Sequence, residues 1–414
     1  MIKASKRLTA DYIAWIVIAT AYAIAFLQRV SPQTVNLSLL RDFRTDATGV
    51  AVLASGYFWG YAAMQIPAGL LVDRFGVRRV ALCSMATSSL GSAVFALCPG
   101  ICSAFVARLI ISCGDALVFT VLLKLVALRF PDSRFGLMSG LSQVSGYVGG
   151  ALATAPLASA ITAFGWRVCF LLVGAAGVIN LGFGSLSIRA ERREHSQKTL
   201  RGLLKVAAIS LRQKVNWGCA MTFASHFAVV TTIAGVWGLP LVADVFHINQ
   251  SEAGIPLLAF MIGNGLGAVV FGHRADRVVH LDRTLMLLCL GRAVLIALLL
   301  PPVMRHFGFG YVVVDFALLG LLAGGTVPLV LKCAKRIYTA EFIGVGASIN
   351  TTTAGILAAI AQPVIGLAMV TASGAAASGS SPSDSGYEAM IGMLTILSLP
   401  GIIGPILMKS AVRH

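Results

Sequence analysis

The chain has 414 residues, of which 57% are hydrophobic and 12% charged, and its formal net charge is +16. A soluble domain carries about 25% charged residues, and a soluble chain this apolar exposes large adhesive patches. The composition therefore argues against a soluble enzyme, a nucleic-acid module and a secreted disulfide scaffold, and it predicts a polytopic membrane protein.

Twelve apolar runs follow one another, each long enough for a spanning helix of roughly 20 residues. The first is too long, and lacks the cleavage site, for a removed signal peptide. We expect an all-α integral membrane protein in which a basic cytoplasmic linker, residues 189–214, joins six spans in residues 1–188 to six in residues 215–414. The predicted spans are 12–39, 48–71, 77–97, 101–130, 135–163, 166–188, 215–246, 251–272, 281–304, 308–332, 342–371 and 387–408.

The Lys and Arg residues predict the orientation of these spans. Most of them fall at the two termini, in the linker and in the loops on the same side, whereas the opposite side holds only Arg41, Arg44, Arg167 and Arg305. Because basic loops stay in the cytoplasm, we expect both termini there, in the inner membrane of a bacterium. The basic excess then needs no nucleic-acid partner; the expected partners are the lipid bilayer, protons and a small molecule, and we expect a monomer.

A loop pattern, Gly-x-x-x-Asp-Arg, occurs twice, between the second and third spans and between the eighth and ninth. Gly allows two helices to approach closely, and Asp caps the following helix and pairs with a nearby Arg. Such a charge cluster can pair in one conformation and part in another, which predicts a cytoplasmic gate. The gate residues are Gly69, Asp73, Arg74, Arg78, Arg79, Asp276 and Arg277.

This loop resembles the signature of the major facilitator superfamily. The twelve spans, the division into six plus six and the degenerate second copy are also similar to that family, so the resemblance covers the whole chain. It implies the major facilitator fold, in which two six-helix bundles surround a central cavity and rock to expose it to each side in turn.

Ionisable residues at membrane depth are costly, and each is a functional hypothesis. Arg29 lies in the outer half of the first span, on one helical face with Tyr22 and Asn36, which are seven residues away on either side. An Arg grips a carboxylate through two parallel hydrogen bonds. We expect Arg29 to bind an anion; the alternative is a structural Arg paired within the bundle.

The fourth span carries Arg108 and Asp115, which are seven residues apart and therefore on one face. A buried carboxylate favours its protonated form, and a nearby Arg opposes this. Asp115 is therefore the predicted proton carrier, and Arg108 is expected to adjust how readily Asp115 is protonated. The alternative is a permanent Arg108–Asp115 ion pair.

The spacing Arg108-x6-Asp115-x8-Lys124-x6-Pro131 resembles the fourth span of the organic-anion:proton symporter branch of the family. That resemblance implies roles in coupling and substrate binding for the acid and the Arg. Gln28-Arg29 is similar to the branch's Asp-Arg pair, although the acid is missing here, and the second span, with Tyr57, Tyr61 and Gln65-Ile-Pro67, also resembles that branch.

The fifth span contains Ser145-Gly-Tyr147-Val-Gly-Gly150, which resembles the drug-exporter signature Gly-Pro-x-x-Gly-Gly without its first Gly and its Pro. Close helix packing explains these glycines equally well. The predicted substrate-binding residues beside Arg29 are Tyr22, Tyr57, Tyr61, Gln143, Tyr147, Asn264 and Asn350.

In the second half, Arg292 and Asp315 differ in depth by roughly one helical turn, which predicts a structural ion pair. His226 is expected to be a packing residue, with titration near neutral pH as the alternative. Trp237 is predicted to be an interfacial anchor or a packing residue.

The eight cysteines show no metal-ligand spacing. Cys98 and Cys102 flank a Pro-Gly turn and are expected to be free, unless that turn faces an oxidising side. No zinc-protease, phosphate-loop or nucleophile-elbow pattern occurs. We therefore expect no enzyme, no metal and no cofactor, and an ion gradient as the driving force.

Together these patterns predict a secondary transporter that moves a small organic anion, a carboxylate in particular, with protons by alternating access. Two rivals stay open: a proton-driven exporter of drugs, siderophores or metabolites, and a transporter-like sensor that moves nothing.

Overall fold

The computed structural model describes residues 2–189, 212–274, 280–337, 343–374 and 383–412. The first half contains α1 (Ile2–Val30), α2 (Pro32–Phe43), α3 (Ala47–Leu97), α4 (Ile101–Arg129), α5 (Asp132–Leu152), α6 (Ala155–Phe164) and α7 (Trp166–Ser187). The second contains α9 (Lys214–Thr232), the π-helical turn η1 (Ile233–Trp237), α10 (Gly238–Phe246), α11 (Gln250–Arg274), α12 (Leu281–Ala297), α13 (Pro301–Phe307), α14 (Phe309–Ile337), α15 (Ile343–Ala372) and α16 (Asp384–Val412).

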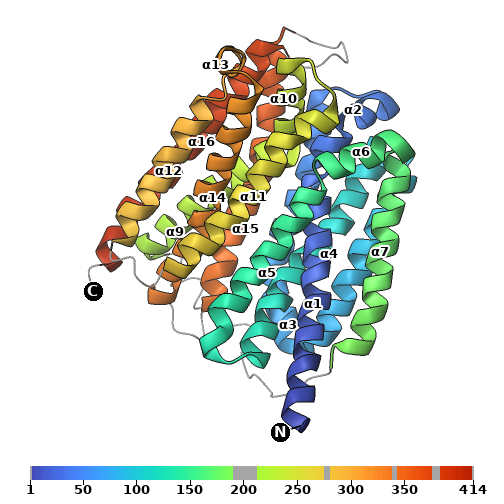
Figure 1. Ribbon diagram of the computed structural model, residues 1–414, viewed down its shortest axis with the longest axis vertical. Coiled ribbons are helices and arrows are strands. Elements are labelled where there is room, and N and C mark those ends of the chain that lie inside the picture. The colour runs from blue at the N-terminus through green and yellow to red at the C-terminus, as the bar shows by residue number, and fades with distance from the viewer. Residues whose placement is uncertain (1, 190–211, 275–279, 338–342, 375–382, 413–414) are drawn as a thin grey trace.

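Helices α1–α7 lie together on one side of the molecule and α9–α16 on the other, with both termini at the same end (Figure 1). The halves meet where α3 packs on α15 and α5 on α11. At the end that carries α2, α6 and α10, Gly254 packs directly on the backbone of Ala155, and the hydroxyls of Ser159 and Ser251 lie 3.2 Å apart.

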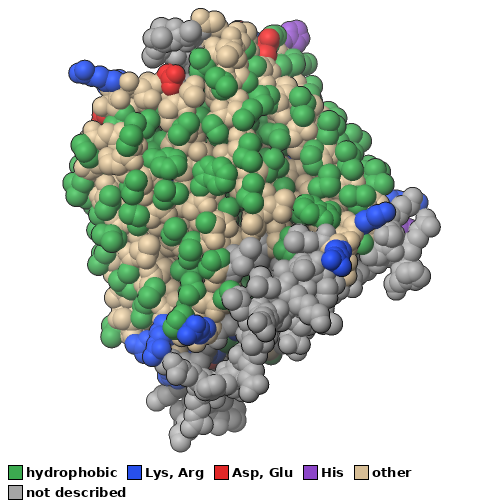
Figure 2. All heavy atoms as spheres, turned by 180° about the vertical axis from the view of Figure 1, so that it is seen from behind, with side chains coloured by type: hydrophobic (Ala, Val, Ile, Leu, Met, Phe, Trp, Pro, Cys, Tyr) green, Lys and Arg blue, Asp and Glu red, His purple; other side chains and the backbone are tan. Residues whose placement is uncertain are grey.

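The lateral surface of the molecule is apolar. Figure 2 shows hydrophobic side chains around its middle and basic side chains at the lower edges, the end of the termini. By length and hydropathy, nine helices in the described ranges are able to cross a membrane, or eleven if two bent pairs each count as one span. The first part of α3 is helical over the predicted second span, residues 48–71, but it is not one of these candidates.

Several predicted spans are broken. The first divides at Ser31 before Pro32, and the fifth bends by 41° between α5 and α6. The ninth was predicted to continue to Met304 but ends at Ala297, and α13 leaves it at 83°. Pro301 and Pro302 explain this correction, because proline lacks the N–H that continues a helix. In α3, the predicted turn between spans two and three is formed at Gly76, whose φ of 80° suits glycine.

The glycines of the fifth span pack helices together. A Cβ on Gly149 would lie 1.8 Å from the backbone oxygen of Ala23 in α1, and one on Gly150 would lie 2.9 Å from Sδ of Met261 in α11. Close packing therefore accounts for the pattern that resembles the exporter signature.

Gly149→Ala is expected to lower the thermal stability of the purified protein, because the α1 backbone must move to admit a methyl group. Overpacking of this kind costs about 1–3 kcal/mol. Gly140→Ala in the same helix is the matched control, since no described atom lies within 4 Å of its Cβ position. Equal melting temperatures for the two variants would contradict the predicted close contact.

Candidate functional site

Arg29 lies in the last turn of α1, just before the break at Pro32, and its side chain is buried among aromatic rings. Its guanidinium carbon is 4.6 Å from the ring centroids of both Phe26 and Tyr61. The rings of Tyr57 and Phe227 follow at 5.7 and 5.6 Å. Phe227 belongs to α9, so both halves of the molecule contact this cation.

The aromatic rings cover the faces of the Arg29 guanidinium plane, but some of its nitrogen atoms lack hydrogen bonds. Nε and Nη2 are buried and have no hydrogen-bond partner among the described residues. These two atoms share one edge of the guanidinium plane, the edge that binds both oxygens of a carboxylate in a bidentate pair. No carboxylate of the described residues forms an ion pair with Arg29; the groups close to its guanidinium are aromatic rings.

Asp115 is buried in α4 and accepts two hydrogen bonds. The Tyr57 hydroxyl donates to Oδ2 over 3.0 Å, and the Ser88 hydroxyl donates to Oδ1 over 2.7 Å. Both carboxyl oxygens act as acceptors, so this arrangement fits the ionised form. Protonation of one oxygen makes that oxygen a weaker acceptor for the hydroxyl that donates to it.

The hydrogen-bond chain continues from Ser88 to Gln28. The Gln28 amide nitrogen donates to the Ser88 hydroxyl over 2.8 Å, and Ser92 donates to the Gln28 amide oxygen over 3.1 Å. Gln28, which stands where the symporter branch has an acid, is thus a fully buried neutral member of the Asp115 network.

Arg108 joins the same network without pairing with Asp115. Its Nη1 donates to the backbone oxygen of Gln28 over 2.7 Å, and its guanidinium carbon is 4.9 Å from the Tyr57 ring. The ion pairs of the described residues do not include Arg108 with Asp115. The alternative of a permanent pair therefore does not hold in this conformation, and the Tyr57 ring lies close to both guanidinium groups.

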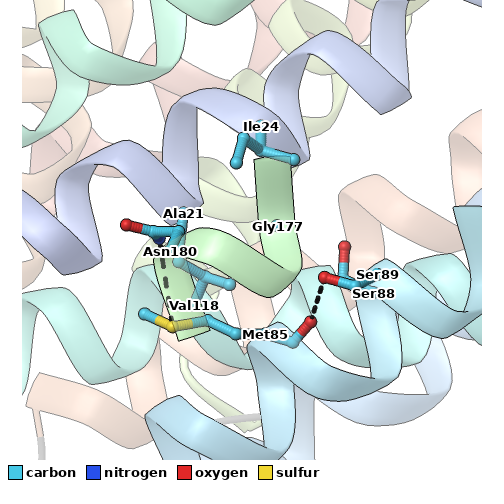
Figure 3. A pocket seen from close by; sticks show the side chains of 8 residues that line it. All are labelled: Ala21, Ile24, Met85, Ser88, Ser89, Val118, Gly177 and Asn180. Carbon is cyan, nitrogen blue, oxygen red and sulfur yellow. Dashed lines mark hydrogen bonds between the residues drawn. The ribbon is translucent and has the colours of Figure 1, made fainter. Parts of the chain in front are cut away.

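A cavity of about 10 Å³ lies beside Ser88, on the side of α1 and α7, and Ser89, Met85 and Asn180 also line it (Figure 3). This is the space of about one water molecule. Asn180 donates to the backbone oxygen of Val17 over 3.0 Å. Polar side chains of α3 and α7 therefore line a small cavity next to Ser88, which is a member of the Asp115 hydrogen-bond network.

Most of the predicted binding residues of the first half gather around Arg29. The Tyr22 hydroxyl donates to the Gln143 side chain over 3.3 Å. The Tyr147 ring is 5.7 Å from that of Phe26, and those of Tyr57 and Tyr61 are 6.2 Å apart and nearly parallel.

The two predicted asparagines of the second half lie elsewhere. Asn264 is buried beside Gly324 between α11 and α14, and its amide atoms have no partner. Asn350 lies in α15, next to Thr351, whose hydroxyl donates over 2.9 Å to Gln65 of α3. Asn350 is thus near a contact between the halves, whereas Asn264 is between two helices of one half.

The predicted gate is described only in part. Arg78 donates to the backbone oxygen of Ser185 over 2.8 Å, Arg74 lies against the Phe75 ring and Arg79 is exposed. The Asp73 side chain and residues Asp276 and Arg277 lie outside the described part of the structure. The expected close helix approach at Gly69 is not found, because no described atom lies within 4 Å of its Cβ position.

The predicted ion pair of the second half is wrong. Arg292 donates to the Ser225 hydroxyl over 2.9 Å, and both carboxyl oxygens of Asp315 lack a partner among the described residues. His226 is buried with its ring 6.1 Å from that of Phe223, which fits packing. Trp237 is fully buried, so it packs inside the protein and is not an interfacial anchor.

Cys98 and Cys102 are both free, as expected. Sequence analysis missed Ser88, Ser92 and Phe227. One signal was present: Ser84, Ser88 and Ser92 are spaced by four residues and therefore share one face of α3. Phe227 carried no signal, because phenylalanine is ordinary in an apolar helix.

Comparison with known proteins agrees with the fold. Residues 15–362 match the family model of the Major Facilitator Superfamily. A bacterial homologue of the human lysosomal transporter Spinster, solved in an inward-facing and unoccupied conformation, superposes with a TM-score of 0.72 over 98% of this chain and 97% of its own, at 15% identity.

Curated relatives are similar over shorter stretches. An uncharacterized transporter of Bacillus subtilis is 29% identical over 45% of this chain and 44% of its own. A hexuronate transporter of the same organism is 26% identical over 38% of each chain. The methylenomycin A resistance protein of Streptomyces coelicolor is 25% identical over 52% of this chain and 48% of its own.

The chain thus spans less than half the length of these curated relatives. The family model, in contrast, extends from α1 into α15 and includes both halves of the fold. The chain belongs to the major facilitator superfamily and has the apolar helices of a multi-pass membrane protein.

Proposed function

We propose that this transporter moves a small organic anion together with protons by alternating access. Arg29 binds the anion, and Asp115 carries the proton. One observation carries the proposal: the unpartnered Nε–Nη2 edge of Arg29 and the doubly hydrogen-bonded carboxylate of Asp115 are connected through one residue, Tyr57.

Charge balance couples the two sites. When Asp115 is ionised, it offsets one of the two buried cations, Arg29 and Arg108. Protonation removes this negative charge, so the site holds two uncompensated cations and binds an anion more strongly. Binding effects of this kind are reciprocal, so a bound anion in turn favours protonation of Asp115. Anion and proton therefore bind together, which is the requirement for symport.

Tyr57 supplies the mechanical link. Its hydroxyl donates to Asp115 while its ring lies near both guanidinium groups. Proton uptake at Oδ2 of Asp115 weakens the hydrogen bond from the Tyr57 hydroxyl, and this loosens the Tyr57 ring near Arg29. Gln28 and Ser88 hold the other carboxyl oxygen in place during this exchange.

The transport cycle then follows from the two halves of the chain. Residues 1–188 and 215–414 rock about the bound substrate, with residues 189–214 as their cytoplasmic connection, and the Asp73–Arg79 loop acts as a cytoplasmic gate. The basic lower edge in Figure 2 supports cytoplasmic termini in the inner membrane. We propose that the monomer performs the cycle.

The relatives support two candidate directions. The hexuronate transporter is named for an organic anion, which favours uptake of an acid. The methylenomycin A resistance protein is named for resistance to an antibiotic, which favours proton-driven export as the second candidate. The free Arg29 edge favours an anionic substrate in either direction.

The deciding experiment measures internal pH in proteoliposomes while sugar acids, mono- and dicarboxylates, amino acids and cationic drugs are added outside. Acidification with an anion, absent from protein-free vesicles, is the expected result. Alkalinisation with a cationic compound would replace symport by antiport. No response to any compound would overturn the proposal and leave the non-transporting sensor.

A further inference from the structure

Four aromatic rings form a row that crosses from one half of the protein to the other. The Phe223 and Phe227 rings of α9 have centroids 6.3 Å apart, and the Phe227 and Tyr61 rings are also 6.3 Å apart. Tyr61 is followed by Tyr57 at 6.2 Å. Neighbouring rings are inclined by only 14°, 18° and 14°, so the row presents nearly parallel faces.

This row leads from α9 to the two groups to which function is assigned above. Arg29 lies between Tyr61 and Phe26, and the Tyr57 hydroxyl at the end of the row donates to Asp115. The Phe223 ring at the opposite end is partly exposed, whereas Tyr57 is fully buried. A second group of rings adjoins Arg29 through Phe26: Tyr22, Phe119 and Tyr147.

The polar groups next to these rings bond mainly to one another. The Tyr22 hydroxyl donates a hydrogen bond to Gln143, and the Tyr57 hydroxyl donates one to Asp115. The Gln28 amide nitrogen donates to Ser88, and its amide oxygen accepts from Ser92. A polyhydroxylated substrate needs a partner for each hydroxyl that leaves water, and an unpaired polar group is strongly disfavoured. Flat apolar faces, in contrast, bind an aromatic ring without any such requirement.

We infer that the substrate is an aromatic carboxylate, in which a planar apolar ring bears the acid group. This inference rests on the proposed function and narrows its substrate class. In the described conformation the Tyr61 and Phe227 rings contact each other and the Arg29 guanidinium. The carboxylate of the substrate takes the Nε–Nη2 edge of Arg29, and its ring stacks on the faces of Tyr61 and Phe227 that are freed when the two halves move apart. Because Tyr61 is in α3 and Phe227 is in α9, the aromatic ring of the substrate contacts both halves of the protein.

The test compares two acids that have the same charge and ring size. Benzoate and glucuronate each carry one carboxylate on a six-membered ring, but only glucuronate carries hydroxyls on that ring. Binding to the detergent-purified full chain is followed by thermal stabilisation over a concentration series, since a ligand that binds the folded state raises the melting temperature. Benzoate is expected to stabilise the protein at a concentration at least about 10-fold lower than glucuronate.

Phe227→Leu keeps an apolar side chain but removes the aromatic face, and it is expected to weaken benzoate binding about 3- to 10-fold. Phe170→Leu is the matched control: Phe170 is a buried phenylalanine of α7 outside the row, and its replacement is expected to leave the affinity unchanged. Equal losses in both variants would mean that Phe227 acts only through general stability, and would overturn the stacking role.

The two levels of the proposal fail differently. If glucuronate binds as tightly as benzoate, or more tightly, and acidifies proteoliposomes, the aromatic substrate class is overturned while anion–proton symport stands. If neither acid stabilises the protein and no anion of the broader panel acidifies the vesicles, the proposed function itself is overturned. Uptake of benzoate is corrected with protein-free vesicles, because the neutral acid crosses lipid unaided.

Discussion

Arg29→Ala is expected to abolish anion uptake into proteoliposomes while the protein still folds. Loss of a charge-assisted bidentate contact to a carboxylate costs about 2–5 kcal/mol, which lowers the rate at limiting substrate by about 30-fold or more. Arg29→Lys keeps the charge but lacks the planar edge formed by Nε and Nη2, so it is expected to retain only weak uptake. Initial rates at several substrate concentrations measure both effects.

Folding is expected to survive because Arg29 has no ion pair within the described protein, and Nε and Nη2 are buried without partners. Removing a buried cation that has no ion pair relieves a desolvation cost, which offsets the loss of the contacts with the Phe26 and Tyr61 rings. The melting temperature of Arg29→Ala is therefore expected to stay close to that of the parent protein. This separates loss of binding from loss of structure.

Arg167→Ala is the matched control for this result. Arg167 belongs to the same half and lies 4.3 Å from the Trp166 ring, but it pairs with Asp42 near the surface and is 41% exposed. Its replacement is expected to leave uptake unchanged. Normal uptake by Arg29→Ala would contradict the role of Arg29 as the anion ligand and assign the anion to another cation.

The sequence was sufficient to predict the membrane fold, since runs of apolar residues report lipid exposure directly. It was less informative about where helices break. The ninth span remains apolar through Leu298–Leu300, so hydropathy continued it to Met304, whereas the adjacent prolines end it earlier. Hydropathy reflects how side chains partition between water and an apolar phase, and it contains no information on the backbone N–H that proline lacks.

The sequence singled out Arg29 and Asp115 because a charge inside the membrane is rare, and the structure shows that both side chains are buried. Ser88 had only the four-residue spacing of Ser84, Ser88 and Ser92 to mark it, and Phe227 had no signal, since phenylalanine is common in spanning helices. The contacts of both residues depend on how the helices pack. The Arg292–Asp315 pair failed for a related reason: similar depth places two residues at one level but does not turn them toward each other. Direction around the helix axis is decided by tertiary packing.

The close-packed glycines illustrate the limit of motif similarity. Ser145-Gly-Tyr-Val-Gly-Gly150 partly matches an exporter signature, yet Gly149 admits the α1 backbone and Gly150 admits Met261. The contact that each glycine makes, rather than the pattern, indicates its role in this chain.

Asp115→Asn is expected to separate anion movement from proton movement. The substitution mimics the protonated carboxyl, since it removes the negative charge that offsets Arg29 and Arg108 while keeping the size of the side chain. Anion binding should therefore persist and become independent of pH. In the parent protein, anion affinity is expected to fall as the pH rises and Asp115 ionises, because the carboxylate then competes with the anion for the positive field.

Two transport assays distinguish these outcomes. Exchange of labelled for unlabelled anion across the vesicle membrane requires no net proton movement and should continue in Asp115→Asn. Accumulation of anion driven by an imposed pH gradient should be lost, with the internal concentration rising no further than the external one. The internal pH should stay constant during anion entry, whereas parent proteoliposomes acidify.

Asp46→Asn is the matched control, because Asp46 caps the N-terminus of α3 outside the spans and accepts a hydrogen bond from the Gly49 N–H over 2.8 Å. Asparagine caps helices as well as aspartate does, so this variant should retain both exchange and accumulation. If Asp115→Asn still acidifies vesicles during anion entry, the proton travels elsewhere. Asp315, a carboxyl group of α14 that is buried without a partner in the described part of the chain, would then be the carrier to test.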